Sequence, residues 1–275
     1  MITFPNAKIN LGLNVIERRE DGFHNIESVM VPIPLCDSLE IVPDNEAALG
    51  NCNMEVYGFN VNGAVSENLC FRAYTQLAEQ YALPAVKIRL LKNIPMGAGL
   101  GGGSTDAAFT IKLLNQLFGL NISSSEMEVL CSGLGSDCSF FIGNEIALVR
   151  GRGEVLNAFG LDLKGYHIAV VYSGLHIDTG GAYSRITPDP SRRDQFNTIL
   201  DSPISQWEGT LVNDFESGAF KKHPQLQAIK EKLYKNGATY ASMSGSGSSL
   251  YGLFKDAVEL DQEFGEYQVW SGTIE

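Results

Sequence analysis

Residues 94–108 read IPMGAGLGGGSTDAA, with five glycines within seven positions ahead of two hydroxyl residues and an alanine pair. The preceding segment 86–91 is strand-like, and apolar residues from 107 to 118 recur at helical spacing before Gly119. The glycines therefore lie between a strand and a helix N-terminus. Glycine lets the backbone approach phosphate oxygens, and the first helical N–H groups attract anions, with the hydroxyls of Ser104 and Thr105 as further donors. The stretch predicts a phosphate-binding loop or, alternatively, a flexible turn with a helix cap.

Three familiar nucleotide loops do not fit this stretch. Gly97, Gly99 and Gly102 satisfy G-x-G-x-x-G, but a second helix follows instead of the parallel strand and acid of a Rossmann unit. A Walker A loop ends in G-K-[ST], and Gly103 stands where its lysine belongs. The V-A-I-K, H-R-D and D-F-G segments of protein kinases are missing.

Composition excludes several classes of function. The 275 residues are 44% apolar, and a net charge of −12 would repel nucleic acid and anionic membranes. The apolar runs are far shorter than the roughly 20 residues of a membrane span, and the start MITFPNAKIN lacks a signal-peptide pattern. The five cysteines form no C-x-x-C pair, which favours reduced thiols. We expect a cytoplasmic protein with neither a nucleic-acid nor a membrane partner.

Strand and helix patterns mix along the chain without a repeat. AKINLGLNVI at 7–16 alternates apolar with polar residues and predicts a half-buried strand. Further strands are expected at 37–42, 53–61, 86–91 and 167–172 and near 269, helices over 67–81, 107–118, 123–135 and 224–237, and a hairpin turn at 151–153. The pattern predicts an α+β fold, with a weak boundary near 160 that separates a domain of residues 1–160 from one of residues 161–275.

Three motifs in order resemble the GHMP kinases. IPMGAGLGGGSTDAA is similar to the second motif of that superfamily, SMSGSGSSLYGLF at 242–254 to its third, and NAKINLGLNV at 6–15 to its N-terminal strand. The resemblance implies a two-domain fold, with a mixed-sheet N-terminal nucleotide-binding domain, an α/β-sandwich C-terminal domain and an active site in the cleft between them.

Within this superfamily the chain most resembles the 4-diphosphocytidyl-2-C-methyl-D-erythritol kinases of the non-mevalonate isoprenoid pathway. Their A-K-x-N-L, R-x-D-G-Y-H, G-A-D-V-P-F-F and N-D-L-E segments are matched by residues 7–11, 19–24, 135–141 and 213–216. Phe23 replaces the usual tyrosine, which keeps an aromatic face but loses a hydroxyl. Ser136, Cys138 and Ser139 replace the common Ala, Val and Pro, and Asp137 is retained.

The resemblance implies ATP-dependent phosphorylation of the substrate's 2-hydroxyl. Asp137 would accept the hydroxyl proton, and Lys8 would hold that carboxylate ionised and offset phosphate charge. Mg²⁺ is expected with ATP, without a dedicated protein cage for it. Asp106 follows the glycines as a first-turn acid favoured by the helix dipole.

The resemblance also assigns contacts with both substrates. His24 would bond the cytosine edge while Phe23 and Tyr183 sandwich the base. The full set of substrate contacts is Asn10, Phe23, His24, Thr179 and Tyr183. The ATP contacts are Pro95, Met96, Gly97, Ala98, Gly99, Leu100, Gly101, Gly102, Gly103, Ser104 and Thr105, with Asn68 and Leu69 beside the adenine.

Two alternatives stay open at this point. One is another GHMP kinase, of homoserine or mevalonate type, and the segment from Asp21 to His24 with its downstream aromatic discriminates against it. The other is a non-catalytic regulator on the same scaffold, which would bind ATP without turnover. A monomer and a homodimer are both compatible with the sequence.

Overall fold

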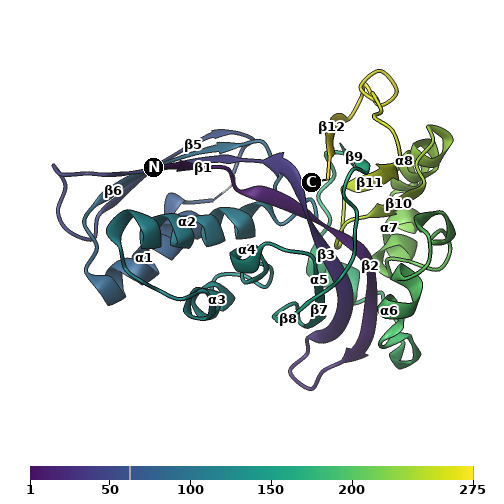
Figure 1. Cartoon of the computed structure of the whole chain (residues 1–275), viewed down its shortest axis with the longest axis horizontal. Helices are drawn as coiled ribbons and strands as arrows, with labels where there is room; N and C mark the ends of the chain where they lie inside the picture. The colour runs from purple at the N-terminus through teal and green to yellow at the C-terminus, as the bar shows by residue number, and fades with distance from the viewer. Residues whose placement is uncertain (62, 275) are drawn as a thin grey trace. The chain divides into compact units, whose positions relative to one another are not determined.

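The computed structural model describes residues 1–61 and 63–274, and two compact units alternate along the chain (Figure 1). Unit 1 comprises Met1–Ala7, Cys36–Met96 and Gly101–Glu145. Unit 2 comprises Lys8–Leu35, Gly97–Leu100 and Ile146–Glu275. These are compact bodies defined by contacts, and the division into functional domains at residue 160 stays a prediction.

Unit 1 contains a mixed sheet whose described strands run in the order β1-β4-β6-β5. Strands β1 (Ile2–Thr3), β4 (Ser38–Pro43) and β6 (Val86–Lys92) pair antiparallel, and β5 (Cys52–Gly58) pairs parallel with β6. On the exposed face of the sheet Arg89 pairs with Glu40 and Glu55. The strands expected here are confirmed, although β5 ends at Gly58 rather than near residue 61.

The helices of unit 1 begin and end at residues with a clear local cause. They are η1 (Val65–Glu67), α1 (Leu69–Tyr81), α2 (Gly102–Phe118), α3 (Ser124–Ser132) and α4 (Phe140–Gly143). Gly119 ends α2 in the left-handed conformation, and Ser123 and Glu126 form the predicted capping box of α3. Helix α2 begins at Gly102, five residues before the apolar pattern does, because glycine contributes no apolar signal.

The first sheet of unit 2 runs in the order β2-β3-β7-β8. Its strands are β2 (Asn6–Arg18), β3 (His24–Cys36), β7 (Ala147–Gly151) and β8 (Val155–Ala158). The hairpin between β7 and β8 is confirmed, with positive φ at Gly151 and Gly153. Strand β3 was not expected from the sequence.

The half-buried prediction for β2 is wrong, because both faces of this strand are buried. Lys8, Asn10 and Asn14 have exposed fractions of only 3%, 1% and 2%. The side chain of Asn14 accepts a hydrogen bond from the Arg192 guanidinium and donates one to the Arg192 carbonyl oxygen. Alternation of polar and apolar residues separates two faces, but the polar face here meets protein hydrogen-bond partners instead of water.

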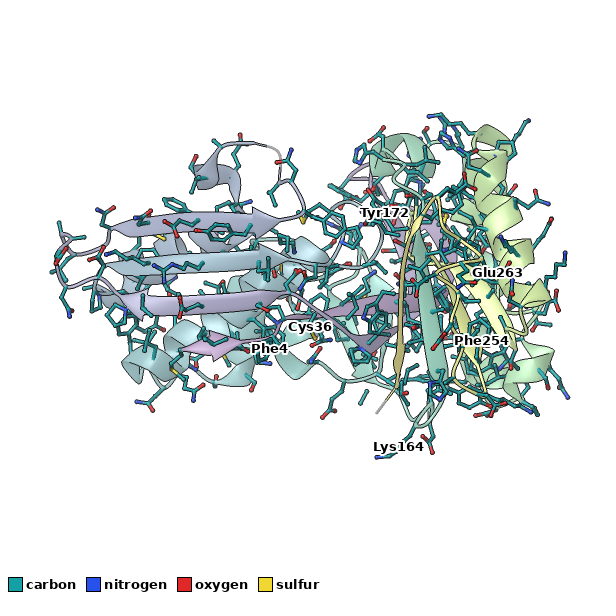
Figure 2. The ribbon with its side chains drawn as sticks, turned by 90° about the horizontal axis from the view of Figure 1, so that it is seen from above. Phe4, Cys36, Lys164, Tyr172, Phe254 and Glu263 are labelled. Atoms are coloured by element: carbon teal, nitrogen blue, oxygen red, sulfur yellow. The ribbon has the colours of Figure 1, made fainter. Side chains whose placement is uncertain are left out.

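The second sheet of unit 2 is antiparallel in the order β10-β11-β9-β12. Its strands are β9 (His167–Tyr172), β10 (Tyr240–Met243), β11 (Leu250–Phe254) and β12 (Gln268–Thr273). Helix α8 (Pro224–Lys235) packs on β10 and β11, and its buried Leu226 and Leu233 share a core with Phe254, labelled in Figure 2. The expected strands at 167–172 and near 269 are confirmed.

The remaining helices of unit 2 are short. They are α5 (Thr179–Tyr183), η2 (Pro190–Arg192), α6 (Gln195–Leu200), η3 (Ile204–Gln206) and α7 (Phe215–Lys222), and α7 was not expected from the sequence. Helices and strands mix in both units, which confirms the α+β class. Within the described residues, no helix combines the length and apolarity needed to cross a bilayer.

Candidate active site

The glycine loop, residues 95–105, follows β6 and includes the first four residues of α2. Gly99 and Gly101 have φ angles of +80° and +74°, a region that glycine adopts without the strain imposed by a Cβ atom. Within unit 2, a Cβ at Gly99 would also overlap the carbonyl oxygen of Ser244. Both the backbone conformation and the close approach therefore require glycine at position 99.

The N-terminus of α2 offers backbone donors. Its N-cap Gly101 has no side chain to accept a hydrogen bond, and the first helical hydrogen bond runs from Thr105 N to Gly101 O at 2.9 Å. The amides of 102–104 precede that bond and have no acceptor four residues earlier. The dipole of this 17-residue helix adds a partial positive charge at its N-terminus. Such a terminus binds anions, phosphates above all.

The turn that carries Asp137 packs against this helix terminus within unit 1. A Cβ at Gly135 would lie 3.5 Å from Ser104 Oγ and 3.2 Å from Cys138 Sγ. Burial raises the pKa of the Cys138 thiol to about 11, and a hydrogen bond from Ser104 partly opposes that shift. Asp137 itself is half-buried. The structure thus brings the Asp137 turn beside the first turn of α2.

Lys8 contacts the glycine loop from β2, within unit 2. Its Nζ donates to Asn10 Oδ1 at 2.5 Å and to the Gly99 carbonyl oxygen at 3.1 Å. Asn10 Nδ2 in turn donates to Ser28 Oγ at 2.8 Å. The ammonium is therefore held in place by a buried chain of hydrogen bonds. Asn10, predicted to contact substrate, uses its side-chain oxygen to position Lys8.

The third glycine-rich segment supports the same loop. Ser244 Oγ donates to the Gly99 carbonyl oxygen at 2.7 Å and accepts from Asn10 N at 3.2 Å. Ser249 N donates to the Ala98 carbonyl oxygen at 3.1 Å. Within unit 2, motifs that are far apart in the sequence thus converge on Ala98 and Gly99.

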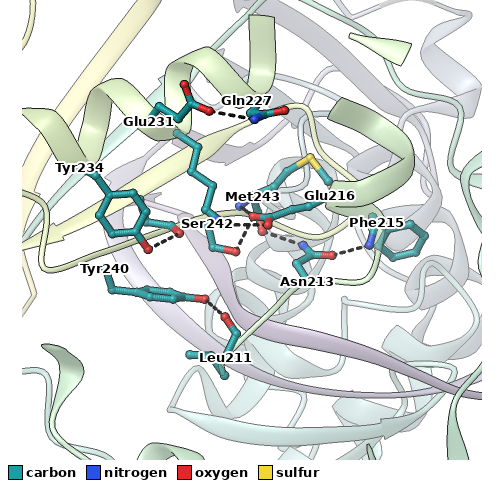
Figure 3. A network of polar contacts seen from close by, with 12 residues as sticks. Leu211, Asn213, Phe215, Glu216, Gln227, Glu231, Tyr234, Tyr240, Ser242 and Met243 are labelled. Carbon is teal, nitrogen blue, oxygen red and sulfur yellow. Dashed lines mark hydrogen bonds and ion pairs between the residues drawn. The ribbon is translucent and has the colours of Figure 1, made fainter. Parts of the chain in front are cut away.

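The NDFE segment at the start of α7 anchors that third motif, as Figure 3 shows. Asn213 Nδ2 donates to the carbonyl oxygens of Met243 and Gly245, at 2.7 and 2.8 Å. Glu216 Oε1 accepts from Ser242 Oγ and from Met243 N, at 2.9 and 2.8 Å. Both side chains are buried, so these hydrogen bonds hold β10 and the turn after it without competition from water.

The aromatic residues predicted to sandwich a base have other partners in the structure. His24 stacks on Tyr183, with ring centroids 4.9 Å apart and an interplanar angle of 14°. Phe23 is 50% exposed, and the Arg152 guanidinium lies 3.9 Å from its ring centroid, a favourable cation–π geometry. His24 thus covers one face of Tyr183, and the sandwich of a base between Phe23 and Tyr183 stays a prediction. Burial, and secondarily the charge of Arg18, lower the pKa of His24.

Thr179 joins the third motif to α5. It is the first residue of α5, and its Oγ1 lies 3.0 Å from Ser246 Oγ. Asp178 caps the same short helix by accepting hydrogen bonds from the amides of Gly180 and Gly181. The exposed hydroxyl of Thr179 is thus fixed at one end of the segment that carries Tyr183.

The residues assigned to adenine lie beside the glycine loop in unit 1. A Cβ at Gly103 would lie 3.7 Å from Leu69 Cδ1 and 3.3 Å from Met96 Cε. Asn68 caps α1, with its Oδ1 accepting from Cys70 N at 2.9 Å. Leu69 and Met96 therefore form an apolar surface at Gly103. The side-chain oxygen of Asn68 is occupied by the hydrogen bond from Cys70 N.

The sequence did not predict a role for Asp37, Lys92 or Arg152. Asp37 accepts a hydrogen bond from Ile94 N, directly before the glycine loop, and Lys92 ends β6, three residues before the loop begins. Arg152 lies over the Phe23 ring, in the turn of the β7–β8 hairpin. A lysine at the end of a strand beside a phosphate-loop motif was a usable signal. Nothing local in the sequence pointed to Asp37 or to Arg152, because each meets its partner through tertiary structure.

Two family models match the chain. The GHMP kinases N terminal domain matches residues 68–144, and the GHMP kinases C terminal domain matches residues 204–266. The first match contains the glycine loop and Asp137, and the second contains the NDFE segment and the third motif.

Similar proteins extend the match over the whole chain. A 4-diphosphocytidyl-2-C-methyl-D-erythritol kinase of Cytophaga hutchinsonii is 47% identical over 96% of this chain and 96% of its own. One of Parabacteroides distasonis is 42% identical over the full length of both chains.

Solved structures show the same fold. A crystal structure of a 4-(cytidine 5'-diphospho)-2C-methyl-D-erythritol kinase is 31% identical, with a TM-score of 0.78 over 99% of this chain and 98% of that one. A mevalonate kinase, 17% identical, has a TM-score of 0.73 over 98% of each chain and supports the fold alone. The chain therefore belongs to the GHMP kinases and, within them, to the family of the 4-diphosphocytidyl-2-C-methyl-D-erythritol kinases.

Proposed function

We propose that the protein is an ATP-dependent kinase that phosphorylates the 2-hydroxyl of 4-diphosphocytidyl-2-C-methyl-D-erythritol. One observation supports this most directly. Lys8 bonds the Gly99 carbonyl oxygen in unit 2, and the Asp137 turn packs on Ser104 in unit 1. Gly99 and Ser104 belong to one glycine loop, so a phosphate-binding segment carries an ammonium contact near its middle and a carboxylate-bearing turn at its end.

In this proposal the glycine loop holds the triphosphate. The amides of 102–104 at the N-terminus of α2 donate to phosphate oxygens, and the helix dipole adds attraction. Leu69 and Met96 supply an apolar surface for the adenine ring beside Gly103. These local groups must overcome the net charge of −12, which repels a nucleotide at long range.

The chemical step needs a base and charge neutralisation. Asp137 accepts the proton of the 2-hydroxyl as that oxygen bonds to the γ-phosphorus, and the bond from this phosphorus to the β–γ bridging oxygen breaks to release ADP. Lys8, held by Asn10, offsets negative charge on the transferring phosphoryl group. Positioning and charge neutralisation supply most of the rate enhancement in such reactions.

The cytidine end is assigned to Phe23, His24, Thr179 and Tyr183. With its pKa lowered by burial, the His24 imidazole is neutral near neutral pH and presents one donor and one acceptor nitrogen, which suits the edge of a pyrimidine. The half-exposed Phe23 ring offers a stacking face. Binding a base between the rings requires the His24–Tyr183 stack to open.

Mg²⁺ is part of the proposal as the partner of ATP. Within residues 1–61 and 63–274, no group of three or more His, Cys, Asp or Glu side chains is placed to hold a metal ion. Phosphate oxygens would therefore be its main ligands, as is usual for Mg²⁺. Thr105 Oγ1 is buried and has no hydrogen-bond partner among the residues that the structure describes, and with Ser104 it places hydroxyl oxygens at the first turn of α2 that suit this cation. Bound there, Mg²⁺ would neutralise charge between the β and γ phosphates.

The decisive variant is Asp137→Asn. We expect it to bind ATP and the cytidyl alcohol with affinities within about threefold of wild type while kcat falls about 10²- to 10⁴-fold. Asp256→Asn, an exposed aspartate in another turn, is the matched control and should keep full activity. Near-normal kcat in Asp137→Asn would remove Asp137 from the mechanism.

An assay of ADP release across several alcohols tests the substrate. The cytidyl alcohol should be turned over with a higher kcat/KM than homoserine or mevalonate, because only the cytidyl compound can use Phe23 and His24. Faster turnover of a smaller alcohol would reassign the protein to another GHMP activity. ATP binding without turnover of any alcohol would favour a regulator. We further propose that the enzyme works in the cytoplasm.

A further inference from the structure

Three ionisable side chains are buried together at the base of the glycine loop, within unit 1. Lys92 Nζ donates to Asp106 Oδ2 at 2.6 Å and also pairs with Asp37. The side chains of Lys92 and Asp37 are 0% exposed and that of Asp106 is 4% exposed. Burying charges carries a large desolvation cost, and an apolar cluster of similar volume often stabilises a fold equally well. Stability alone is therefore a poor explanation for this cluster.

The cluster joins the two ends of the glycine loop. Asp37 Oδ1 accepts hydrogen bonds from Asn93 N and Ile94 N, at 2.5 and 2.8 Å, directly before the loop begins. Asp106 lies one residue after the loop ends, as the fifth residue of α2, so the expectation of an acid in the first turn of this helix is wrong. Lys92 bonds both carboxylates. The entrance and the exit of the loop are thus tied through a single ammonium group.

The start of α2 also packs directly on this cluster. A Cβ at Gly102 would lie 3.3 Å from Lys92 Nζ and 2.9 Å from Ile94 Cγ2. Any shift of Lys92 therefore displaces Gly102, the first residue of α2.

Lys92 is not placed to bind phosphate itself. Its ammonium is fully buried and bonded to two carboxylates, so it has neither the exposure nor the net positive field that attracts an anion. With one cation and two acids the cluster is neutral or negative in sum, which gives no electrostatic attraction for ATP. Its effect on the loop must be geometric.

We propose that Asp37, Lys92 and Asp106 form a clamp that closes the base of the glycine loop and acts as a set of positioning residues for ATP. The proposal rests on the kinase function proposed above. An open loop must lose conformational entropy when it wraps a triphosphate, and a loop whose ends are already joined loses less. The clamp therefore favours nucleotide affinity, and it leaves the alcohol site and the phosphoryl transfer unaffected once ATP is bound.

Asp106→Ala is the variant that opens the clamp without leaving an unpaired buried charge. It releases the exit of the loop, and Lys92 and Asp37 remain as a matched pair. Asp106→Asn keeps an oxygen acceptor for Lys92 and serves as the conservative variant. Ile111→Val, fully buried in the same helix, controls for lost packing alone.

The measurements are the dissociation constant of ATP by calorimetry, the KM of each substrate and kcat. Asp106→Ala should raise the dissociation constant and the KM of ATP by about tenfold or more, because one charge-assisted hydrogen bond is lost. The kcat and the KM of the alcohol should stay within about threefold of wild type. Asp106→Asn and Ile111→Val should stay near wild type for ATP.

Unchanged ATP affinity in Asp106→Ala would overturn the clamp. Equal rises in both KM values with a fall in kcat of the same size would also overturn it, because that pattern is the signature of general misfolding. Ile111→Val weakening ATP binding as much as Asp106→Ala does would overturn it as well. Wild-type protein that fails to bind ATP would instead overturn the proposed function, so the two failures are distinguishable.

Discussion

The substitution Gly99→Ala should destabilise the glycine loop in several ways, all of which follow from adding a Cβ atom at position 99. Alanine at a φ of +80° costs about 1–2 kcal/mol relative to its preferred conformations. The new Cβ would also overlap the Ser244 carbonyl oxygen, so the backbone at position 99 must move. That movement disturbs the hydrogen bonds that the Gly99 carbonyl oxygen accepts from Ser244 Oγ and Lys8 Nζ.

The expected magnitude follows from these contacts. A neutral hydrogen bond contributes about 1 kcal/mol net, and one from a charged group about 1.5–3 kcal/mol. We therefore expect Gly99→Ala to lower the free energy of unfolding by about 3–6 kcal/mol if both hydrogen bonds are lost. Because Lys8 shifts with the loop, kcat/KM for ATP should fall about a hundredfold, the usual effect of misplacing a reacting group by about 1 Å.

Gly218→Ala is the matched control. Gly218 lies within α7, and a Cβ there would meet no atom of the described residues within 4 Å. Alanine is the better helix former, so this variant should gain up to about 1 kcal/mol and keep full activity. Urea unfolding of both variants, with ADP release as the activity assay, makes the comparison. The inference that the loop packs closely on Ser244 would be refuted if Gly99→Ala kept a free energy of unfolding within about 1 kcal/mol of wild type and a kcat/KM for ATP within about tenfold.

Two further predictions concern groups that hold the site from a distance. Asn213→Ala leaves two buried carbonyl oxygens without their donor and should cost about 2–4 kcal/mol in urea unfolding. Asn197→Ala, at an exposed position of α6, should cost less than about 1 kcal/mol, and equal costs in the two variants would deny the anchor role. Burial, opposed by Lys92 and reinforced by Asp37, raises the pKa of Asp106 to about 8. The folded protein thus keeps a proton that the unfolded chain releases, so the free energy of unfolding should fall from about pH 4 to about pH 8 and then level off. Asp106→Asn should flatten this slope in urea titrations across that range, and an unchanged slope would contradict the assignment.

Local chemistry explains why much of the fold was predictable. The capping box from Ser123 to Glu126, the left-handed Gly119 and the alternation along β2 each depend on residues that are neighbours in sequence. The candidate phosphate loop was identifiable for the same reason, because glycine spacing and the following helix determine where amides are free. The roles of Lys8 and Asp137 in catalysis stay predictions.

The sequence by itself determined many of the elements, although not β3 or α7, and it indicated the candidate phosphate loop, because short-range propensity and glycine geometry act between neighbouring residues. Only the tertiary structure decided that the polar face of β2 is buried, that His24 stacks on Tyr183, and that Asp37 and Lys92 close the loop. These features depend on contacts such as that of Asn10 N with Ser244 Oγ, which are 234 positions apart. A polar alternation specifies two faces of a strand, but the partner that covers each face is chosen by packing across the whole unit.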